Sequence, residues 1–269
     1  MSLAGGRLPW VAGAAPGAHA TSHPLPESPL LSGGDPGTGR AANPDRTFPP
    51  YEEVTTMVDY DRMRLEELAS ISEFTGSLAD AQWDHASLCE GWRVRDVISH
   101  MCLGYTTPMA SMLGKVARRG FNVDRASKEE SIAYGSAHSP AEIQAVLESI
   151  HRERIRRGIA RVIKPRDGLV DHIVHHQDVR RPLGQPRAVP EDRLRAALDV
   201  LPGLGGFVKA KQRIAGLRLV ADDLGWSHGD GPEVRGSGEA ILLAATGRAV
   251  ALDELQGEGV ATLRQRVAA

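Results

Sequence analysis

A regular helical pattern near residue 100 constrains the fold more than any other feature of this chain. Between residues 93 and 119, hydrophobic side chains recur so that, at about 100° per residue, they form one narrow stripe. The stripe consists of Val94, Val97, Ile98, Met101, Tyr105, Met112 and Val116. Such a stripe indicates an amphipathic helix that packs one face against a core. Pro108 lies inside the pattern and predicts a kink or a break, because proline cannot donate a backbone hydrogen bond.

Helical spacing or helix-start signals also occur in residues 58–78, 139–162, 168–184 and 190–204. Ser139 and Pro140 open the second of these segments with a capping hydroxyl and a proline at the first helical position. After Gly216 the pattern changes to short runs that are typical of strand, turn, strand and helix. We therefore expect a mainly α fold, an up-down bundle of four or five helices, followed by a small α/β C-terminal domain.

Composition suggests where the domains begin and end. The first fifty residues contain 17 Gly and Pro and no helical or strand period, which is typical of a low-complexity segment. We expect residues 1–50 to be a disordered leader without chemistry. The helical bundle is expected over residues 51–210 and the small α/β domain over residues 211–269.

Charge and hydropathy argue against several classes of function. A formal net charge of −2 speaks against a nucleic-acid-binding protein, which normally carries a basic patch. No apolar run approaches the ~18–20 residues that cross a bilayer. The two cysteines, Cys89 and Cys102, are too few for a disulfide framework and fit a reducing, cytoplasmic location. We expect both to be buried packing residues, and Trp92 likewise.

The stretch GLVDHIVHHQDVRRPLG concentrates three histidines and two aspartates within eight positions. On a helix, Asp171, His175 and Asp178 lie within about 60° of one another, whereas His172 and His176 lie about 100° further round. A carboxylate and an imidazole four residues apart, or two such imidazoles, can reach one metal ion. Spacing does not choose between the two faces, nor between a metal site and a polar helix end whose histidines complement the helix dipole.

A metal site on this helix needs a third ligand from another helix. His100 is the best candidate, because it lies off the apolar stripe on a mostly polar face that also carries Asp96 and Thr107. In a helical bundle, such a face borders either solvent or a polar cavity.

Two segments resemble the mycothiol-dependent maleylpyruvate isomerase family, which belongs to the DinB-like metal-binding superfamily. LCEGWRVRDVISHM, residues 88–101, is similar to the family pattern C-x-G-W-x-V-x-D-x-x-x-H. VDHIVHHQDVRRPLG, residues 170–184, is similar to a signature in which an acid and a histidine four residues later precede D-x-R-x-x-L-G. The C-terminal GPEVRGSGEAILLAATGRA resembles the family's small second domain. The resemblance covers about residues 55–266.

The resemblance implies a DinB-like four-helix bundle that binds one divalent metal, usually zinc, through His, Glu and His. These positions fall on His100, Asp171 and His175. Asp171 departs from the usual Glu and is one methylene shorter, so the ion or the helix must shift, or the site is weaker. The resemblance also implies that Arg248 holds substrate carboxylates, for which a planar guanidinium is suited, although it could instead bond helix-end carbonyls. Asp178 either orients His175 or pairs with a neighbouring arginine on the surface.

Three protein ligands and an open position are typical of a catalytic zinc site, at which a bound thiol loses its proton. We therefore expect a metal-dependent enzyme that uses a low-molecular-weight thiol, mycothiol by resemblance, for isomerisation or S-transfer on a small electrophile. No nucleic-acid or membrane partner is expected. One alternative is a non-catalytic DinB-like metal-binding protein, a sensor or a scavenger. Another is an interaction module that has lost its metal.

Overall fold

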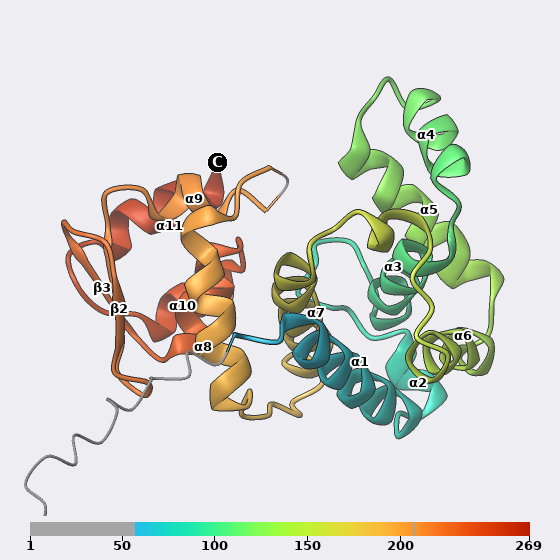
Figure 1. The fold of residues 1–269 in the computed structure, drawn as a ribbon, viewed down its shortest axis with the longest axis horizontal. Coiled ribbons are helices and arrows are strands. Elements are labelled where there is room, and N and C mark those ends of the chain that lie inside the picture. Colours follow the sequence, from blue (N-terminus) through green and yellow to red (C-terminus); the bar gives the residue numbers. More distant parts are fainter. Residues whose placement is uncertain (1–56, 207) are drawn as a thin grey trace, which may run out of the picture. The chain divides into compact units, whose positions relative to one another are not determined.

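The computed structural model describes residues 57–206 and 208–269 (Figure 1). Helices dominate the described residues before the sheet: α1 Tyr60–Gly76, α2 Asp80–Trp83, α3 Val94–Thr106, α4 Met109–Ala117, α5 Val123–Ala137, α6 Pro140–Arg152, η1 Gly158–Arg161, α7 Pro165–Arg180, α8 Glu191–Val200, η2 Leu201–Gly203 and α9 Ala210–Ile214. The C-terminal elements are β1 Arg218–Ala221, β2 Trp226–His228, β3 Glu233–Gly236, α10 Gly238–Ala245, η3 Ala249–Glu254 and α11 Val260–Ala268.

Helices α1, α3, α6 and α7 share one hydrophobic core. The predicted stripe of α3 forms its centre, where Val97 and Ile98 are fully buried. Ile71 of α1 and Leu147 of α6 reach the same core, and Val179 of α7 closes it. The spacing of hydrophobic residues thus places four helices around one interior, as the sequence predicts.

Two helix boundaries follow the local chemistry of the sequence. Pro108 separates α3 from α4, so the predicted break is confirmed. At α6, the Ser139 hydroxyl accepts a hydrogen bond from the backbone N–H of Glu142, and the Glu142 carboxylate accepts one from the backbone N–H of Ser139. This reciprocal pair satisfies two N–H groups that a helix start leaves without partners.

The predicted end of α6 near residue 162 is wrong, because the helix ends at Arg152. Arg154 has a φ of 50° and Gly158 a φ of 57°, and neither value is helical. A side chain at Gly158 is excluded, because its Cβ would lie 2.3 Å from the carbonyl oxygen of Thr107. The helix thus ends at the left-handed turn of Arg154, and the chain then passes close to the end of α3.

Helix α5 and strand β2 are absent from the sequence prediction. Helix α5 buries only Ala126, Ser131 and Gly135, so it has no stripe of large hydrophobic residues to reveal it. Strand β2 has three residues and buries only Trp226. Both elements are too weakly patterned for hydrophobic periodicity to detect.

The C-terminal elements form a three-stranded sheet in the order β2-β1-β3, covered by α10. Strand β1 pairs antiparallel with β2 and parallel with β3, with Leu219 opposite His228 and Val234. Residues 240–245 of α10 are all buried, in a core that also takes in residues of α7 and α8. The predicted class, mainly α with a small α/β part at the C-terminus, is confirmed.

The predicted leader, residues 1–50, lies outside the described residues. The boundaries of the predicted domains at residues 51–210 and 211–269 stay predictions. Among the described helices, none combines the length and the apolar character that a membrane crossing requires.

Candidate metal centre

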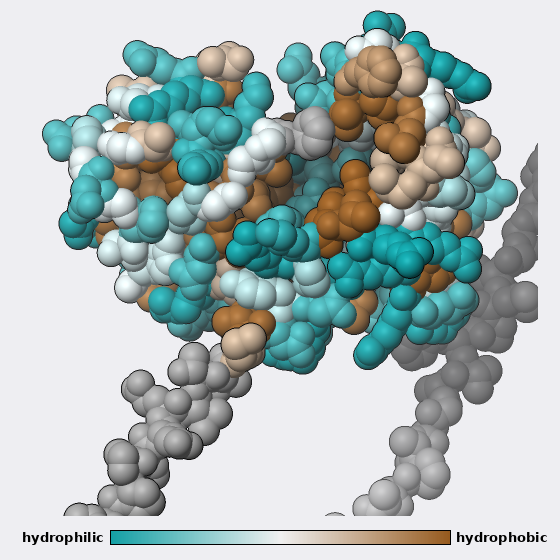
Figure 2. Space-filling model, turned by 45° about the horizontal axis from the view of Figure 1, so that its top comes forward, coloured by the Kyte–Doolittle hydropathy of each residue, from teal (hydrophilic) through white to brown (hydrophobic). Residues whose placement is uncertain are grey.

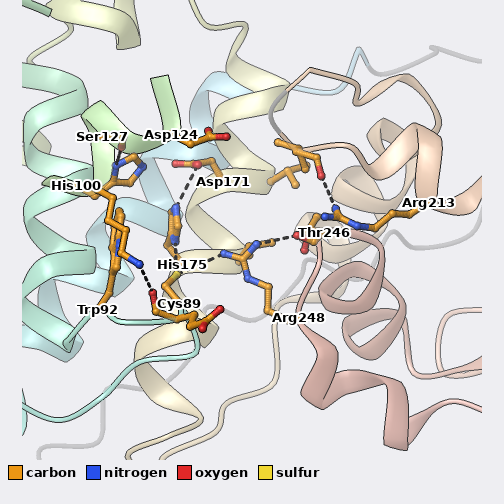
Figure 3. Close-up of a pocket in the computed structure, with 15 residues that line it drawn as sticks. Cys89, Trp92, His100, Asp124, Ser127, Asp171, His175, Arg213, Thr246 and Arg248 are labelled. Carbon is orange, nitrogen blue, oxygen red and sulfur yellow. Dashed lines mark hydrogen bonds and ion pairs between the residues drawn. The ribbon is translucent and has the colours of Figure 1, made fainter. Parts of the chain in front are cut away.

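Helices α3 and α7 bring the three predicted ligands together at the wall of a polar pocket (Figure 3). One ligand atom each of His100, Asp171 and His175 lies within 4.8 Å of the other two. Asp171 and His175 share a face of α7, where the carboxylate Oδ1 lies 3.5 Å from the imidazole Nε2. The structure therefore juxtaposes two residues of one helix with a third residue about seventy positions earlier in the chain.

The loop before α3 holds this helix against α7. The backbone N–H of Leu88 donates to the carbonyl oxygen of Asp178, at 3.0 Å. Gly91 has a φ of 74°, a conformation that glycine adopts without a steric cost, and it turns the chain toward Trp92. The Asp96 carboxylate then caps α3 by accepting a hydrogen bond from the backbone N–H of Arg93 at 2.9 Å. The motif residues Gly, Trp and Asp thus set the direction in which α3 starts.

Both candidate imidazoles are oriented by a hydrogen bond on Nδ1, which leaves Nε2 for a ligand. His175 Nδ1 lies 2.9 Å from Asp178 Oδ2, and His100 Nδ1 lies 3.0 Å from the hydroxyl of Ser127 on α5. Metal-binding histidines in proteins show this pattern, in which an oxygen acceptor on one nitrogen fixes the tautomer that presents the other.

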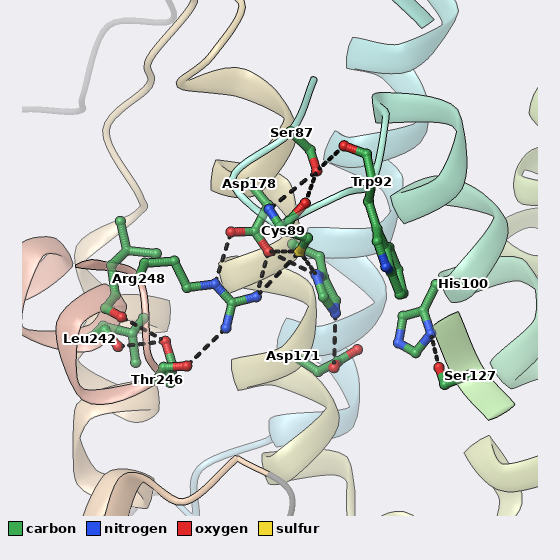
Figure 4. Close-up of polar contacts among 12 residues, drawn as sticks. Ser87, Cys89, Trp92, His100, Ser127, Asp171, Asp178, Leu242, Thr246 and Arg248 are labelled. Atoms are coloured by element: carbon green, nitrogen blue, oxygen red, sulfur yellow. Dashed lines mark hydrogen bonds and ion pairs between the residues drawn. The ribbon is translucent and has the colours of Figure 1, made fainter. Parts of the chain in front are cut away.

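Asp178 is buried and is held by Arg248 (Figure 4). Arg248 Nε donates to Asp178 Oδ1 at 2.9 Å, and Nη2 donates to Oδ2 at 2.5 Å. The expected surface pairing of Asp178 with Arg180 or Arg181 is not formed, since Arg181 instead pairs with Glu239. The contacts agree with the other expectation, in which Asp178 orients His175.

Arg248 reaches the pocket because α10 ends in Thr-Gly-Arg. Gly247, with a φ of 102°, reverses the chain after the helix, and Arg248 Nη1 donates to the carbonyl oxygen of Thr246 at 2.9 Å. Its guanidinium therefore already binds Asp178 and a helix-end carbonyl. The predicted binding of a substrate carboxylate by Arg248 stays a prediction. Only some of the N–H groups of this guanidinium are free for such a carboxylate.

Charge is distributed unevenly over the two imidazoles. Burial, and then the neighbouring His175, lower the pKa of His100 to about 4, so this ring is neutral at pH 7 and can offer a lone pair. Burial opposes protonation of His175, but Asp171 and Asp178 raise its pKa well above the ordinary value. The pKa of Asp171 lies below its usual range, because His175 outweighs the effect of burial. The pocket wall thus concentrates negative charge around His175.

The expectation that both cysteines are inert packing holds for Cys102 only. Cys102 is 1% exposed, and burial raises its pKa to about 12. Cys89 is half-buried at the pocket wall, where its Sγ lies 3.1 Å from Asp178 Oδ2 and 4.0 Å from His175 Nδ1. Trp92 is also half-buried, and its ring forms a T-shaped pair with the ring of His100. Both residues contact the core and line the pocket. They lie on the loop before α3, which has no helical periodicity to indicate this.

Cys89, His175 and Asp178 form a second group whose ligand atoms lie within 4.8 Å of one another. In this group, however, both oxygens of Asp178 accept hydrogen bonds from the Arg248 guanidinium. A cation placed there would lie beside a positive charge at short range, which is unfavourable in a partly buried site. The group of His100, Asp171 and His175 is the better fit for a cation.

The donor set of His100, Asp171 and His175 suits a divalent ion. Zinc bonds of about 2.0–2.2 Å in tetrahedral geometry place the ligand atoms roughly 3.3 Å apart. Asp171 and His175 are already close to that separation, at 3.5 Å. The ligand atoms of His100, Asp171 and His175 lie at most 4.8 Å from one another. These distances have to shorten by no more than about 1.5 Å, which side-chain rotation provides. The shorter Asp side chain is therefore compatible with the site.

Other residues of the pocket were not found by sequence reasoning. The polar pocket has a volume of about 390 Å³ and is also lined by Asp124, Ser127, Lys128 and Arg213. Arg213 Nη1 donates to the carbonyl oxygen of Val208 at 2.6 Å, and its Nε is buried without a partner among the described residues. These residues come from α5 and α9, and α5 itself was missed.

Comparisons with known proteins find one family model and two similar crystal structures. Residues 64–180 match the family model described as the mycothiol maleylpyruvate isomerase N-terminal domain. The structure is similar to the crystal structure of the mycothiol-dependent maleylpyruvate isomerase, with 18% identity, a TM-score of 0.50 and coverage of 74% of this chain and 91% of that one. A histidine-to-alanine mutant of that enzyme matches with 17% identity, the same TM-score and the same coverage. No curated protein matches the chain.

Proposed function

Because residues 64–180 match the family model of the mycothiol maleylpyruvate isomerase N-terminal domain, we propose that this chain is a metal-dependent enzyme. It uses a low-molecular-weight thiol, mycothiol by family, for isomerisation or S-transfer on a small electrophilic substrate. The observation that carries the proposal is the convergence of His100, Asp171 and His175 at a pocket wall. A divalent ion, zinc in our proposal, would stabilise the thiol as its thiolate and fix its orientation.

The residues around the three ligands have separate tasks in this proposal. Ser127 and Asp178 hold the rings of His100 and His175 with Nε2 toward the pocket. Arg248 binds Asp178 through two hydrogen bonds and so keeps this acceptor ionised and immobile. Trp92 packs on the ring of His100, at a centroid distance of 5.3 Å, and limits the access of water to that side.

The pocket offers two guanidinium groups for a carboxylate on the substrate. Arg248 is neutralised by Asp178, whereas Arg213 forms no ion pair with the described residues and is held by the carbonyl oxygens of Val208 and Ala245. Burial, and then the nearby Arg248, lower the pKa of Arg213, so an anion beside it would stabilise its charged form. We assign the larger part of carboxylate binding to Arg213, with the remaining donor of Arg248 as its partner.

Turnover with the thiol tests this function. The purified protein, loaded with zinc, is assayed for isomerisation of a cis-unsaturated keto diacid and for conjugation of a simple electrophile, with and without mycothiol. We expect turnover that requires mycothiol and is lost in His175→Ala. Stoichiometric metal without thiol-dependent turnover on any electrophile would contradict the enzyme and favour the alternative, a metal-binding sensor or scavenger.

The same assay separates the two arginines. We expect Arg213→Gln to raise KM for a carboxylate substrate about 10–100-fold, in line with the loss of one charge-assisted contact, without changing the metal content. Arg248→Gln should lower both kcat and the thermal stability, because it leaves Asp178 buried without its partner. Equal effects of both variants on KM alone would contradict this division of roles.

A further inference from the structure

A second cavity meets the polar pocket at the candidate ligands. It has a volume of about 600 Å³, within the range of about 300–1,000 Å³ that small-molecule sites occupy. His100, Asp171 and Ser127 line both cavities. We call this second cavity the apolar cavity. The hydrophobic side chains that line it come from α3, α4, α5 and η1 and from the loops before α7 and α9: Met101, Leu103, Tyr105, Met112, Val116, Val123, Ala126, Ile159, Ala160, Ile163, Leu204 and Val208.

Most of the wall of the apolar cavity is not part of either hydrophobic core. Leu103, Met112, Val116 and Ile159 are only partly buried, and helix α4 buries none of its residues. In Figure 2, hydrophobic side chains gather at the upper right, beside a hollow in the surface. Hydrophobic surface that stays accessible inside a concave site is a source of binding free energy for an apolar ligand.

Some of the charged groups at this cavity are neutralised by ion pairs. Lys115 of α4 pairs with Glu130 of α5 at 2.5 Å, and Arg64 pairs with Asp61 at 2.8 Å and hydrogen bonds to Tyr105. The first pair also ties α4, which has no buried residue, to α5. Asp124, Lys164 and Asp167 also line the cavity, but its hydrophobic side chains outnumber the charged ones, in contrast to the polar pocket with Arg213 and Arg248.

We propose that the apolar cavity binds the hydrophobic body of the electrophile, so that the substrate carries an alkyl or aryl group next to its reacting carbon. Groups bound there end at His100 and Asp171, where the proposed metal ion lies. Polar parts of the reactants then occupy the polar pocket on the other side of these two residues. That the bound molecule is a substrate rests on the proposed function. That the cavity binds an apolar molecule does not depend on it.

Binding of straight-chain primary alcohols tests the proposal without any reaction. Isothermal titration of butanol, hexanol, octanol and decanol is carried out on the zinc-loaded protein and on the protein after treatment with a chelator. We expect affinity to rise about fourfold per methylene group, as burial of hydrocarbon predicts, in both preparations. An affinity that is independent of chain length would overturn the proposal.

Two substitutions on α4 locate the alcohols. Val116→Asp places a charge in the apolar cavity, and Leu113→Asp places the same charge on a 62% exposed position of the same helix that does not line the cavity. We expect Val116→Asp to weaken octanol binding at least tenfold and Leu113→Asp to change it less than twofold. Equal losses in the two variants would show binding to the outer surface of α4 and would overturn the proposal.

A third variant tests the cavity without changing α4, in case the substitutions on α4 disturb its folding. Leu103→Trp lies on α3 and adds volume inside the cavity. It should abolish binding of decanol while circular dichroism and metal content stay as in the unmodified protein.

The two proposals can fail separately. Thiol-dependent turnover without alcohol binding would refute this inference alone, whereas alcohol binding to a protein without turnover would refute the proposed function alone.

Discussion

Helix α7 carries histidines on two faces, and these faces differ in their surroundings. Asp171, His175 and Asp178 lie on the face toward the polar pocket, where His175 is 12% exposed. His172 and His176 lie on the other face and are at most 2% exposed. Residue type and i, i+4 spacing are alike on both faces, so the surroundings supplied by other helices decide what each histidine can do.

The buried face has no nitrogen left for a metal. His176 Nδ1 lies 2.8 Å from Glu67 Oε1, and its Nε2 accepts a hydrogen bond from Arg180 at 2.8 Å. His172 contacts the carbonyl oxygen of Arg64 and the hydroxyl of Tyr105 with its two nitrogens. Burial lowers the pKa of each ring to about 4. These histidines are neutral, fully hydrogen-bonded parts of the interior, whereas the pocket face keeps the Nε2 atoms of His100 and His175 accessible.

The largest effect should come from removing a ligand on the pocket face. We expect His175→Ala and His100→Ala each to reduce bound zinc from about one equivalent per chain to less than about 0.1, because a catalytic site needs its three protein ligands. Elemental analysis after dialysis measures this. His85→Ala, an exposed histidine outside the site, serves as the control and should bind zinc normally.

Removing a histidine from the buried face should change stability instead. His176→Ala deletes a hydrogen bond to the carboxylate of Glu67, which also binds Arg187 and Arg193. We expect the free energy of unfolding to fall by about 1.5–3 kcal/mol, the range for a hydrogen bond to a charged group, with zinc content unchanged. Urea unfolding in the presence of a chelator gives the first quantity. If zinc content fell in His176→Ala and not in His175→Ala, the buried face and not the pocket face would bind the metal, which would contradict the account.

A substitution that removes the support of His175, but not His175 itself, should have an intermediate effect on zinc binding. Asp178→Asn keeps the shape of the side chain but weakens the acceptor on Nδ1 and leaves Arg248 without a counter-charge. We expect zinc affinity to weaken about 10–100-fold, as for other oxygen acceptors behind metal-binding histidines. Competition with a coloured chelator measures the affinity, and a value equal to that of the unmodified protein would show that Asp178 serves Arg248 alone.

Cys89 should have the smallest effect, although it lies close to His175. Cys89→Ser removes the thiol that lies 4.0 Å from His175 Nδ1 and leaves the proposed ligands intact. We expect zinc affinity to change less than about threefold, below the ~1.4 kcal/mol of a tenfold change. A loss as large as that of His175→Ala would move the ion to the group of Cys89, His175 and Asp178.

Much of the helical architecture follows from the sequence, because it depends on local signals. The stripe of α3, the break at Pro108 and the cap at Ser139 all act within a few residues. Helix α5 is not predicted because its buried positions are small. Helix α6 ends early at the left-handed Arg154, and the chain beyond it packs Gly158 against the backbone of Thr107. That contact joins residues about fifty positions apart, so no local pattern contains it.

The site was predictable only in part, for a related reason. Spacing on α7 offered two faces, and the resemblance, not the periodicity, selected Asp171 and His175. The partners that distinguish the faces, such as Glu67 and Ser127, lie on other helices and appear only when the chain is folded. Cys89 was assigned to packing because its position beside Asp178 depends on the loop before α3.

A crystal structure of the zinc-soaked protein, with anomalous diffraction recorded on both sides of the zinc edge, tests the central claim most directly. The account predicts one zinc peak about 2.0–2.2 Å from His100 Nε2, His175 Nε2 and a carboxylate oxygen of Asp171. A peak bound by Cys89 and Asp178, or no peak on the pocket face of α7, would contradict it.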